Sequence, residues 1–420
     1  MIKTISLQPG VTLRCFRDSR FKQGFLSIQF IRPMDKEEAA LNALIPAVLL
    51  RGSENTPDMR SITLRLDDLY GAALGPLLRR IGDYHAVGLY ASFISDKYAL
   101  EGDPVLEPAV AFMEELLLHP ALEAGVFRAE YIQSEKKNLI STIEAQRNDK
   151  RAYAAAQLFG KMCSGDSYGI PRLGEASQVK KITPQGAYAH YKKLLAESRA
   201  DIFYVGQAEP ERVAKLVAPI FQKINRNYVN LPEQTPFCPQ GGGEHTETME
   251  IAQGKLCMGF ATDITLGRED FAAMQVCNTL FGGGMTSKLF MNIREKMSLC
   301  YDISSAYYGS KGIVTVSAGI DCDKESVVRE QVLEQLAAIE RGEVSAQELN
   351  AAKQGLVSSL QGIHDTPGGI ENYSATGAVS GLGMTPEEYI RKVEEVTPEQ
   401  VYAAARTVKL DTVFFLKGVQ

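Results

Sequence analysis

The sequence contains an internal duplication, which restricts the fold more than any other feature of the chain. The segment LISTI at 139–143 matches LVSSL at 356–360, at an offset of 217 residues. The segment ITPQGAYAHY at 182–191 matches VTPEQVYAAA at 396–405, at an offset of 214. Matches that keep the same order at nearly the same offset indicate a repeat. We therefore predict two copies of one domain of about 200 residues, within the usual range of domain sizes.

The spacing of apolar residues predicts the same order of elements in both copies. Alternation predicts strands at 72–81 and 84–94, and helical spacing predicts long helices near 104–118 and 126–147. In the second copy, strands are expected in SLCYDISSAYY and GIVTVSAGI, followed by long helices near 324–341 and 346–363. The expected class is α+β, with a mainly antiparallel sheet and helices on one face in each copy.

Residues 225–245 are the expected linker, because they hold three prolines, three consecutive glycines and no apolar period. This places an N-terminal domain at 1–224 and a C-terminal domain at 246–420. The charge differs between the halves: residues 1–230 carry 30 basic and 26 acidic groups, and residues 231–420 carry 15 and 25. A basic body followed by an acidic one suggests that a partner or substrate lies between them.

Composition excludes several classes of protein. The net charge of −6 argues against a nucleic-acid binder, which usually carries a basic excess. The seven cysteines are scattered without a C-x-x-C, so neither a disulfide framework nor a cysteine zinc site is indicated. We see no apolar signal segment at the start and no run of about 20 apolar residues, so we expect a cytoplasmic protein without a membrane partner.

The most specific segment is FGGGMTSKLFMNIREKMSLCY at 281–301. It is not a phosphate-binding loop, since the G-x-x-x-x-G-K-[ST] spacing is missing. It is not a dinucleotide fingerprint either, because its glycines follow a helix and not a strand. The structural alternative is a glycine-rich helix end that lets the chain turn sharply.

This segment closely resembles the C-terminal signature of the pitrilysin/insulinase family, the inverzincin metallopeptidases that include mitochondrial processing peptidase. The family pattern is a glycine-rich turn, then S-[KR]-L-[FY], then R-E-K, then a tyrosine seven residues after the arginine. Here these are Gly282–Gly284, Ser287–Phe290, Arg294–Lys296 and Tyr301. The resemblance implies a tandem duplication of a LuxS/MPP-like metallohydrolase domain, in agreement with the repeat.

The zinc motif of active family members is degenerate in this chain. Those members carry His-x-x-Glu-His on the helix that ends in L-[FL]-[KR]-G-[ST], where two histidines bind zinc and the glutamate is the general base. Counting back from Leu49–Ser53 places the motif on Ala43 to Ala47, with Pro46 at the position of the base.

The third ligand of active members is a glutamate on a later helix, and the matching stretch here is LISTI, with Ser141 and Thr142 at the acidic positions. Catalytic zinc needs three protein ligands. We therefore expect no metal and no cofactor in this chain, and no peptidase activity of its own. The resemblance implies that zinc belongs to a partner subunit.

Arg294 and Tyr301 remain from the family's site, where this pair contacts the substrate backbone and the scissile carbonyl. A guanidinium and a phenol are donors that can stabilise a developing oxyanion. The alternative is structural: Arg294 pairs with Glu295 at the surface, and Tyr301 caps the sheet.

The resemblance implies a non-catalytic subunit that pairs with a zinc-bearing paralogue, or with a second copy of itself, around an extended peptide. Sheet-edge hydrogen bonds would hold the peptide. The chain is most similar to bacterial paralogues encoded beside an active peptidase, one group of which is associated with aminopentanol modification of elongation factor P. Two alternatives stay open: a scaffold without a role in proteolysis, and an enzyme using other chemistry through Cys300 or His364.

Overall fold

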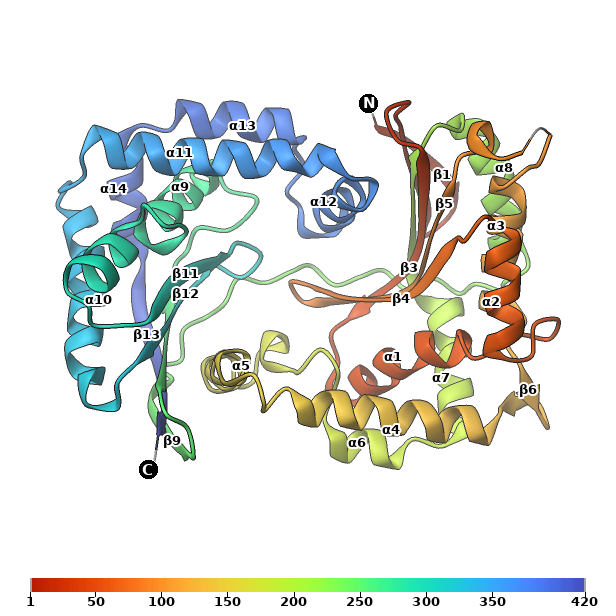
Figure 1. Cartoon of the computed structure of the whole chain (residues 1–420), viewed down its shortest axis with the longest axis horizontal. Coiled ribbons are helices and arrows are strands. Elements are labelled where there is room, and N and C mark those ends of the chain that lie inside the picture. Colours follow the sequence, from red (N-terminus) through yellow and green to blue (C-terminus); the bar gives the residue numbers. More distant parts are fainter. Residues whose placement is uncertain (1, 101, 419–420) are drawn as a thin grey trace. The chain divides into compact units, whose positions relative to one another are not determined.

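The computed structural model describes residues 2–100 and 102–418, which form two compact units (Figure 1). Unit 1 comprises the residues up to Glu144, Ile170–Glu233 and His364–Thr376. Unit 2 comprises Ala145–Gly169, Gln234–Ile363 and the residues from Gly377 onward. Each unit therefore contains most of one half of the chain and a short segment of the other half.

Unit 1 is built on a six-stranded sheet in the order β1-β2-β8-β3-β5-β4. Neighbouring strands are antiparallel except β2 and β8, which are parallel. The strands are β1 (Ile2–Gln8), β2 (Val11–Arg17), β3 (Gln23–Pro33), β4 (Ala73–Ile81), β5 (Tyr84–Ile94) and β8 (Arg199–Gly206). A small pair, β6 (Leu122–Glu123) and β7 (Val126–Phe127), stands apart from it.

Helices cover one face of this sheet, because alternate residues of its central strands are apolar. On β3, Leu26, Ile28 and Phe30 are buried in one cluster with residues of the covering helices. The helices of this half are α1 (Lys36–Leu49), α2 (Met59–Asp68), α3 (Leu106–Leu118), α4 (Ala129–Ala145), α6 (Ala176–Lys181), α7 (Pro184–Glu197) and α8 (Pro210–Gln222).

Unit 2 contains a five-stranded sheet in the order β11-β12-β10-β13-β9. Strands β13 and β9 are parallel, and the other neighbours are antiparallel. The strands are β9 (Gly243–Met249), β10 (Gly254–Ala261), β11 (Asp302–Tyr308), β12 (Ile313–Ile320) and β13 (Lys409–Gly418). The helices are α5 (Lys150–Met162), α9 (Phe271–Gly282), α10 (Glu325–Glu340), α11 (Ala346–Gln361), α13 (Pro386–Glu395) and α14 (Pro398–Thr407).

The two sheets share one topology, which confirms the predicted fold class and tandem repeat. The order β2-β8-β3-β5-β4 corresponds strand by strand to β9-β13-β10-β12-β11, and β1 is an addition to unit 1. The repeated segments also lie on equivalent helices, α4 with α11 and α7 with α14. Both α7 and α14 begin in the same way, with a threonine N-cap, Thr183 or Thr397, followed by proline.

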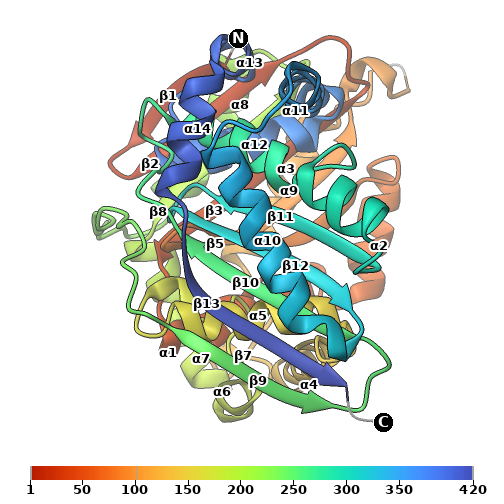
Figure 2. The ribbon, with the colours of Figure 1, turned by 90° about the vertical axis from the view of Figure 1, so that its left-hand side faces the viewer.

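Each unit carries one further helical segment on the second face of its sheet, a placement that the sequence did not predict. In unit 2 this is α5, which lies behind the sheet in Figure 2, while α10 and α14 lie in front of it. In unit 1 it is His364–Thr376, the start of α12 (Pro367–Ser380). Because α5 follows α4 and α12 follows α11, the two halves exchange equivalent helices.

The exchanged segment of unit 1 is held by a buried carboxylate. Glu371 is completely buried, and its carboxylate accepts hydrogen bonds from Ser27 Oγ and Gln29 Nε2, both at 2.7 Å. Arg79 donates to both of its oxygens, at 3.0 and 2.7 Å. The exchanged segment of unit 2 is held differently: Ala154 and Leu158 of α5 pack in an apolar cluster with Cys257 and Phe414.

The stretch 225–242 of the predicted linker has no helix or strand. It packs against other residues, since Tyr84 donates a hydrogen bond to the Pro232 carbonyl and Phe237 is buried. After the glycine-rich turn, Leu289–Lys296 forms a π-helix. Such wide turns are rare and often mark functional sites.

Candidate functional site

The degenerate zinc positions lie on α1, which begins at the N-cap Asp35. Ala43 and Ala47 are one helical turn apart and partly buried, and Pro46 between them is buried. Their side chains hold only carbon and hydrogen, so they offer no lone pair to a metal. Proline also lacks the N–H that would hydrogen-bond to the carbonyl of Asn42.

The third position is no better suited to zinc. Thr142 is exposed on α4, and its hydroxyl donates to the Asn138 carbonyl of the same helix at 2.9 Å. A hydroxyl alone cannot replace two imidazoles and a carboxylate. In residues 2–100 and 102–418, no group of three or more His, Cys, Asp or Glu side chains is arranged to hold a metal ion. The donor set does not fit the zinc that the family implies.

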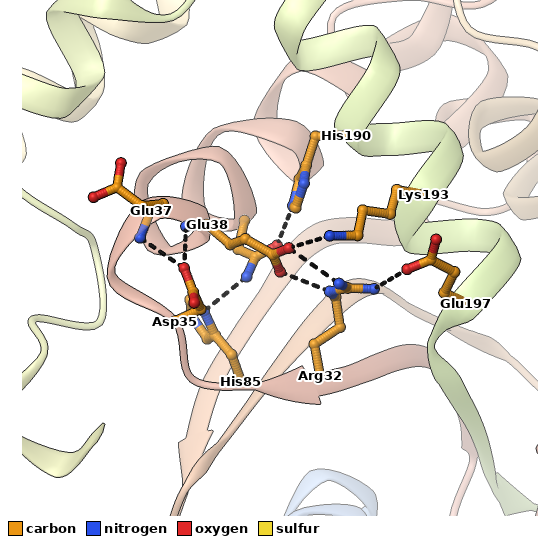
Figure 3. A network of polar contacts seen from close by, with 9 residues as sticks. Arg32, Asp35, Glu37, Glu38, His85, His190, Lys193 and Glu197 are labelled. Carbon is orange, nitrogen blue, oxygen red and sulfur yellow. Dashed lines mark hydrogen bonds and ion pairs between the residues drawn. The ribbon is translucent and has the colours of Figure 1, made fainter. Parts of the chain in front are cut away.

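A polar network lies around the beginning of α1 (Figure 3). Asn42 is completely buried between two histidines from distant parts of the chain: its Oδ1 lies 2.8 Å from His190 Nε2, and its Nδ2 lies 3.2 Å from His85 Nδ1. If Asn42 donates to His85 and accepts from His190, His85 carries its proton on Nε2, a buried atom that finds no hydrogen-bond partner within the described part of the chain. The sequence did not reveal this pairing, because residues 42, 85 and 190 are far apart.

A charged cluster around Glu38 lies close enough for its charge to act on His190. Arg32 donates to both Glu38 oxygens, at 2.8 and 3.1 Å, and Lys193 donates at 2.7 Å. Glu197 lies 3.6 Å from the other side of the Arg32 guanidinium. These contacts join β3, α1 and α7, so the network fixes the helix that would carry the zinc ligands in an active relative.

The electrostatics of this network keep both histidines neutral at pH 7. Burial lowers the pKa of His85 to about 3, assisted by the charges of Arg80 and Arg172. Burial also lowers the pKa of His190 to about 4, although the charge of Glu38 opposes the shift. Burial alone would raise the pKa of Glu38, but the hydrogen bonds from Arg32 and Lys193 outweigh it and lower that pKa to about 2.

Arg294 and Tyr301 lie on either side of one turn in unit 2. Arg294 is in the π-helix Leu289–Lys296, where its guanidinium stacks over the Phe290 ring at 4.6 Å and lies 3.8 Å from Glu295. Tyr301 immediately precedes β11, and its hydroxyl donates to Asp321 at 2.9 Å. The turn between them includes Ser298, which has a positive φ of 52°.

Both side chains are accessible, with 40% of the Arg294 side chain and 53% of Tyr301 exposed. The hydrogen bond to Asp321 and its negative charge raise the pKa of Tyr301, so the phenol remains a donor at neutral pH. Arg294 and Tyr301 are therefore held by different partners: Arg294 keeps guanidinium donors that can face a ligand, whereas the one donor of Tyr301 is engaged by Asp321.

Neither Cys300 nor His364, the two residues of the alternative chemistry, lies in surroundings that would activate it for catalysis. Burial raises the pKa of Cys300 to about 11, with Asp302 adding to the shift, so this thiol is protonated at neutral pH. His364 lies in a short 3₁₀ turn, with its ring centroid 6.0 Å from that of Phe16.

Among the described residues, the helices are too short or too polar to cross a bilayer.

This arrangement defines a class: a metallopeptidase-like protein with a duplicated α+β fold whose zinc positions have lost their ligands. Comparison with known proteins agrees. Residues 181–356 match the family model "Peptidase M16 inactive domain". The "Probable inactive metalloprotease YmfF" of Bacillus subtilis (strain 168) is 30% identical over 411 residues, which cover 98% of this chain and 96% of that protein.

Solved structures share the fold over the full length. A conserved protein from Enterococcus faecalis V583 superposes with a TM-score of 0.93 at 29% identity, covering 100% of this chain and 99% of that one. A peptidase M16 inactive domain from Pseudomonas fluorescens has a TM-score of 0.82 at 19% identity, covering 100% and 98%. The chain belongs to the M16, or pitrilysin-like, peptidase family, as an inactive peptidase homologue, and the predicted family is confirmed.

Proposed function

We propose that this chain is the non-catalytic subunit of a two-chain zinc peptidase. A paralogue with an intact His-x-x-Glu-His would hold the zinc, and this chain would contribute part of the wall around an extended peptide. Arg294 and Tyr301 would donate hydrogen bonds to the peptide carbonyls. The observation that carries the proposal is the contrast between the two sites: the zinc positions are carbon side chains, whereas the arginine–tyrosine pair is present and accessible.

The chemistry of the pair supports a role at a carbonyl. A guanidinium and a protonated phenol can both stabilise the negative charge that develops on a carbonyl oxygen during peptide hydrolysis. To reach a substrate, the Tyr301 hydroxyl would exchange its hydrogen bond to Asp321 for one to the peptide. Stacking on Phe290 limits the positions of the Arg294 guanidinium and reduces the entropy lost on binding.

The test combines the purified chain with a zinc-bearing paralogue from the same genome and measures cleavage of a fluorogenic peptide. We expect cleavage only in the mixture, and a loss of about 100-fold in kcat with Arg294→Ala, the usual effect of removing one oxyanion donor. Arg391→Ala, on the exposed surface of α13, is the matched control and should leave the rate unchanged.

Three outcomes would contradict the proposal. Equal cleavage by mixtures containing the wild-type and Arg294→Ala chains would refute the oxyanion role. If the paralogue neither binds this chain nor gains activity from it, the protein is a scaffold, or it acts as a homodimer, which light scattering on the purified chain would show. Stoichiometric zinc on this chain alone would refute the assignment as a non-catalytic subunit.

A further inference from the structure

Unit 2 contains a cavity of about 290 Å³ on the second face of its sheet, between the N-terminal half of α5 and the strands β11 and β12. Its walls include many short side chains, among them Ala152 and Ala155 from α5, Ser304 and Ala306 from β11, and Ser317 from β12. The register pairs Ser304 with Ser317 and Ala306 with Thr315, which places these side chains on one face. Short side chains on both sides leave the space open.

The two ends of α5 differ. Further along the helix, Leu158 closes onto the sheet in the apolar cluster with Cys257 and Phe414, and Phe159 stacks edge-on against Tyr308 at 5.1 Å. On the N-terminal half, the same gap is faced by the methyl groups of alanines. In unit 1, the equivalent face is closed by Glu371 and its hydrogen bonds. The gap beside the N-terminal half of α5 is thus a feature of unit 2 that the equivalent face of unit 1 does not share.

The rim of the cavity carries charges that are already engaged. Asp149 caps α5 and accepts from the backbone N–H groups of Arg151 and Ala152, at 3.1 and 3.0 Å. Arg151 donates to Ser304 Oγ at 2.6 Å and lies 3.8 Å from Asp302. One cation, Arg151, and one carboxylate, Asp149, therefore line the opening, and the other walls are methyl and hydroxyl groups and the ring of Tyr308.

The cavity is lined by the strand that begins directly after the residue that the proposed function places at the peptide. Tyr301 directly precedes Asp302, the first residue of β11, and its backbone N–H donates to the Gly319 carbonyl at 2.8 Å. Tyr301 therefore stands where the β11–β12 ladder begins. Ser304 and Ala306, two of the residues that line the cavity, follow on β11. Since a strand of this size is about 20 Å long, both lie within about 20 Å of Tyr301.

We propose that this cavity is a specificity pocket for one small, uncharged side chain of the peptide that Tyr301 contacts. The inference rests on the proposed function. A volume of about 290 Å³ is at the lower limit of pockets that enclose a whole small ligand, so it suits a single side chain. Since Asp149 already accepts from the backbone of α5 and Arg151 already bonds to Ser304 and Asp302, an acidic or basic side chain would lose its hydration without compensation. The hydroxyl and methyl walls fit valine, threonine or alanine.

The test measures binding of four fluorescein-labelled nonapeptides to the full chain by fluorescence anisotropy. Each has a lysine at both ends and glycine at the other flanking positions, so that only the central residue offers a side chain to the pocket: Val, Glu, Lys or Trp. We expect the Val peptide to bind at least about tenfold more tightly than the Glu and Lys peptides, the effect of about 1.4 kcal/mol. Ala306→Phe, which fills the cavity, should weaken binding of the Val peptide by a similar factor.

Two further variants separate filling of the cavity from damage to the fold. Ala155→Leu fills the same cavity from α5 and should act like Ala306→Phe. Ala156→Phe places an aromatic ring on the exposed side of α5 and should bind the Val peptide like the wild type. Equal binding of all four peptides, unchanged by Ala306→Phe and Ala155→Leu, would refute the pocket and leave the proposed function standing. Failure of the wild-type chain to bind any of the peptides would contradict both.

Discussion

Replacing Glu371 by alanine should destabilise unit 1 severely. The carboxylate is completely buried and accepts hydrogen bonds from Ser27, Gln29 and both terminal nitrogens of Arg79. Breaking a buried ion pair costs about 3–5 kcal/mol, because the remaining charge loses its partner. Since 23% of the Arg79 side chain is exposed, water can solvate part of it, so the lower end of that range applies.

The two neutral donors add to this cost. Ser27 and Gln29 are completely buried, and each loses a partner, at about 1 kcal/mol apiece. We therefore expect Glu371→Ala to lower the free energy of unfolding by about 5 kcal/mol, combining the ion-pair and hydrogen-bond terms. Glu371→Gln keeps the shape and one acceptor oxygen, and it should cost about 2 kcal/mol, the value of a charged hydrogen bond.

Urea unfolding can measure the stability change in this region alone. Because the chain contains no tryptophan, a single introduced tryptophan is the only one that fluoresces. A Ser374→Trp reporter, on the same exchanged segment and partly buried, would give fluorescence from this region alone. Glu144→Ala, which replaces an exposed glutamate on α4, is the control and should change stability by less than about 0.5 kcal/mol. A loss below about 1 kcal/mol for Glu371→Ala would show that the carboxylate does not anchor the segment, contrary to the reasoning from burial.

Three further predictions follow from other groups. His190→Gln should flatten the pH dependence of stability. The wild-type free energy of unfolding is highest above pH 6.5 and falls toward pH 4, because only the unfolded chain takes up the proton, and the variant should remove about 1.4 kcal/mol per pH unit from that slope. Parallel curves of the urea-derived free energy against pH for the two chains would contradict this prediction. Asp166→Asn should destabilise unit 2 by about 3 kcal/mol, because it leaves the completely buried ammonium of Lys311 without its carboxylate at 3.0 Å; a differential scanning calorimetry trace with an unchanged Tm would refute this. Metal analysis of the chain purified alone should find far less than one zinc per chain, and EDTA should leave its Tm unchanged, since Ala43, Ala47 and Thr142 supply no ligand set; a Tm that falls with EDTA would contradict it.

The sequence predicted the fold well because the fold depends on local periodicity. Alternating residues placed a strand at 84–94, and β5 spans Tyr84–Ile94. The two pairs of matching segments predicted the duplication, because equivalent helices keep equivalent contacts. The exchanged helices could not be predicted in this way. The pattern of α5 shows which of its faces is apolar, but not which of two sheets that face covers.

The site was predictable only where a motif stands in one stretch of sequence. The loss of the zinc ligands could be located at Ala43, Pro46 and Ala47 by counting from the end of their helix. The pairing of His85 with His190 through Asn42 joins three distant positions, and no spacing rule connects them. Glu371 gave no signal either, because a glutamate in a helical stretch is usually solvated, and its burial depends on partners more than 290 positions earlier in the chain.

The exchange of helices has a consequence for how the chain is made. A ribosome releases the N-terminal end first, and domains commonly fold during synthesis. Unit 1, however, requires His364–Thr376, so its sheet stays without Glu371 until almost nine-tenths of the 420 residues have been joined. Until then, Ser27, Gln29 and Arg79 lack the carboxylate to which they donate hydrogen bonds in the finished unit. Neither half, cut at the middle of the sequence and expressed alone, contains all the parts of a finished unit.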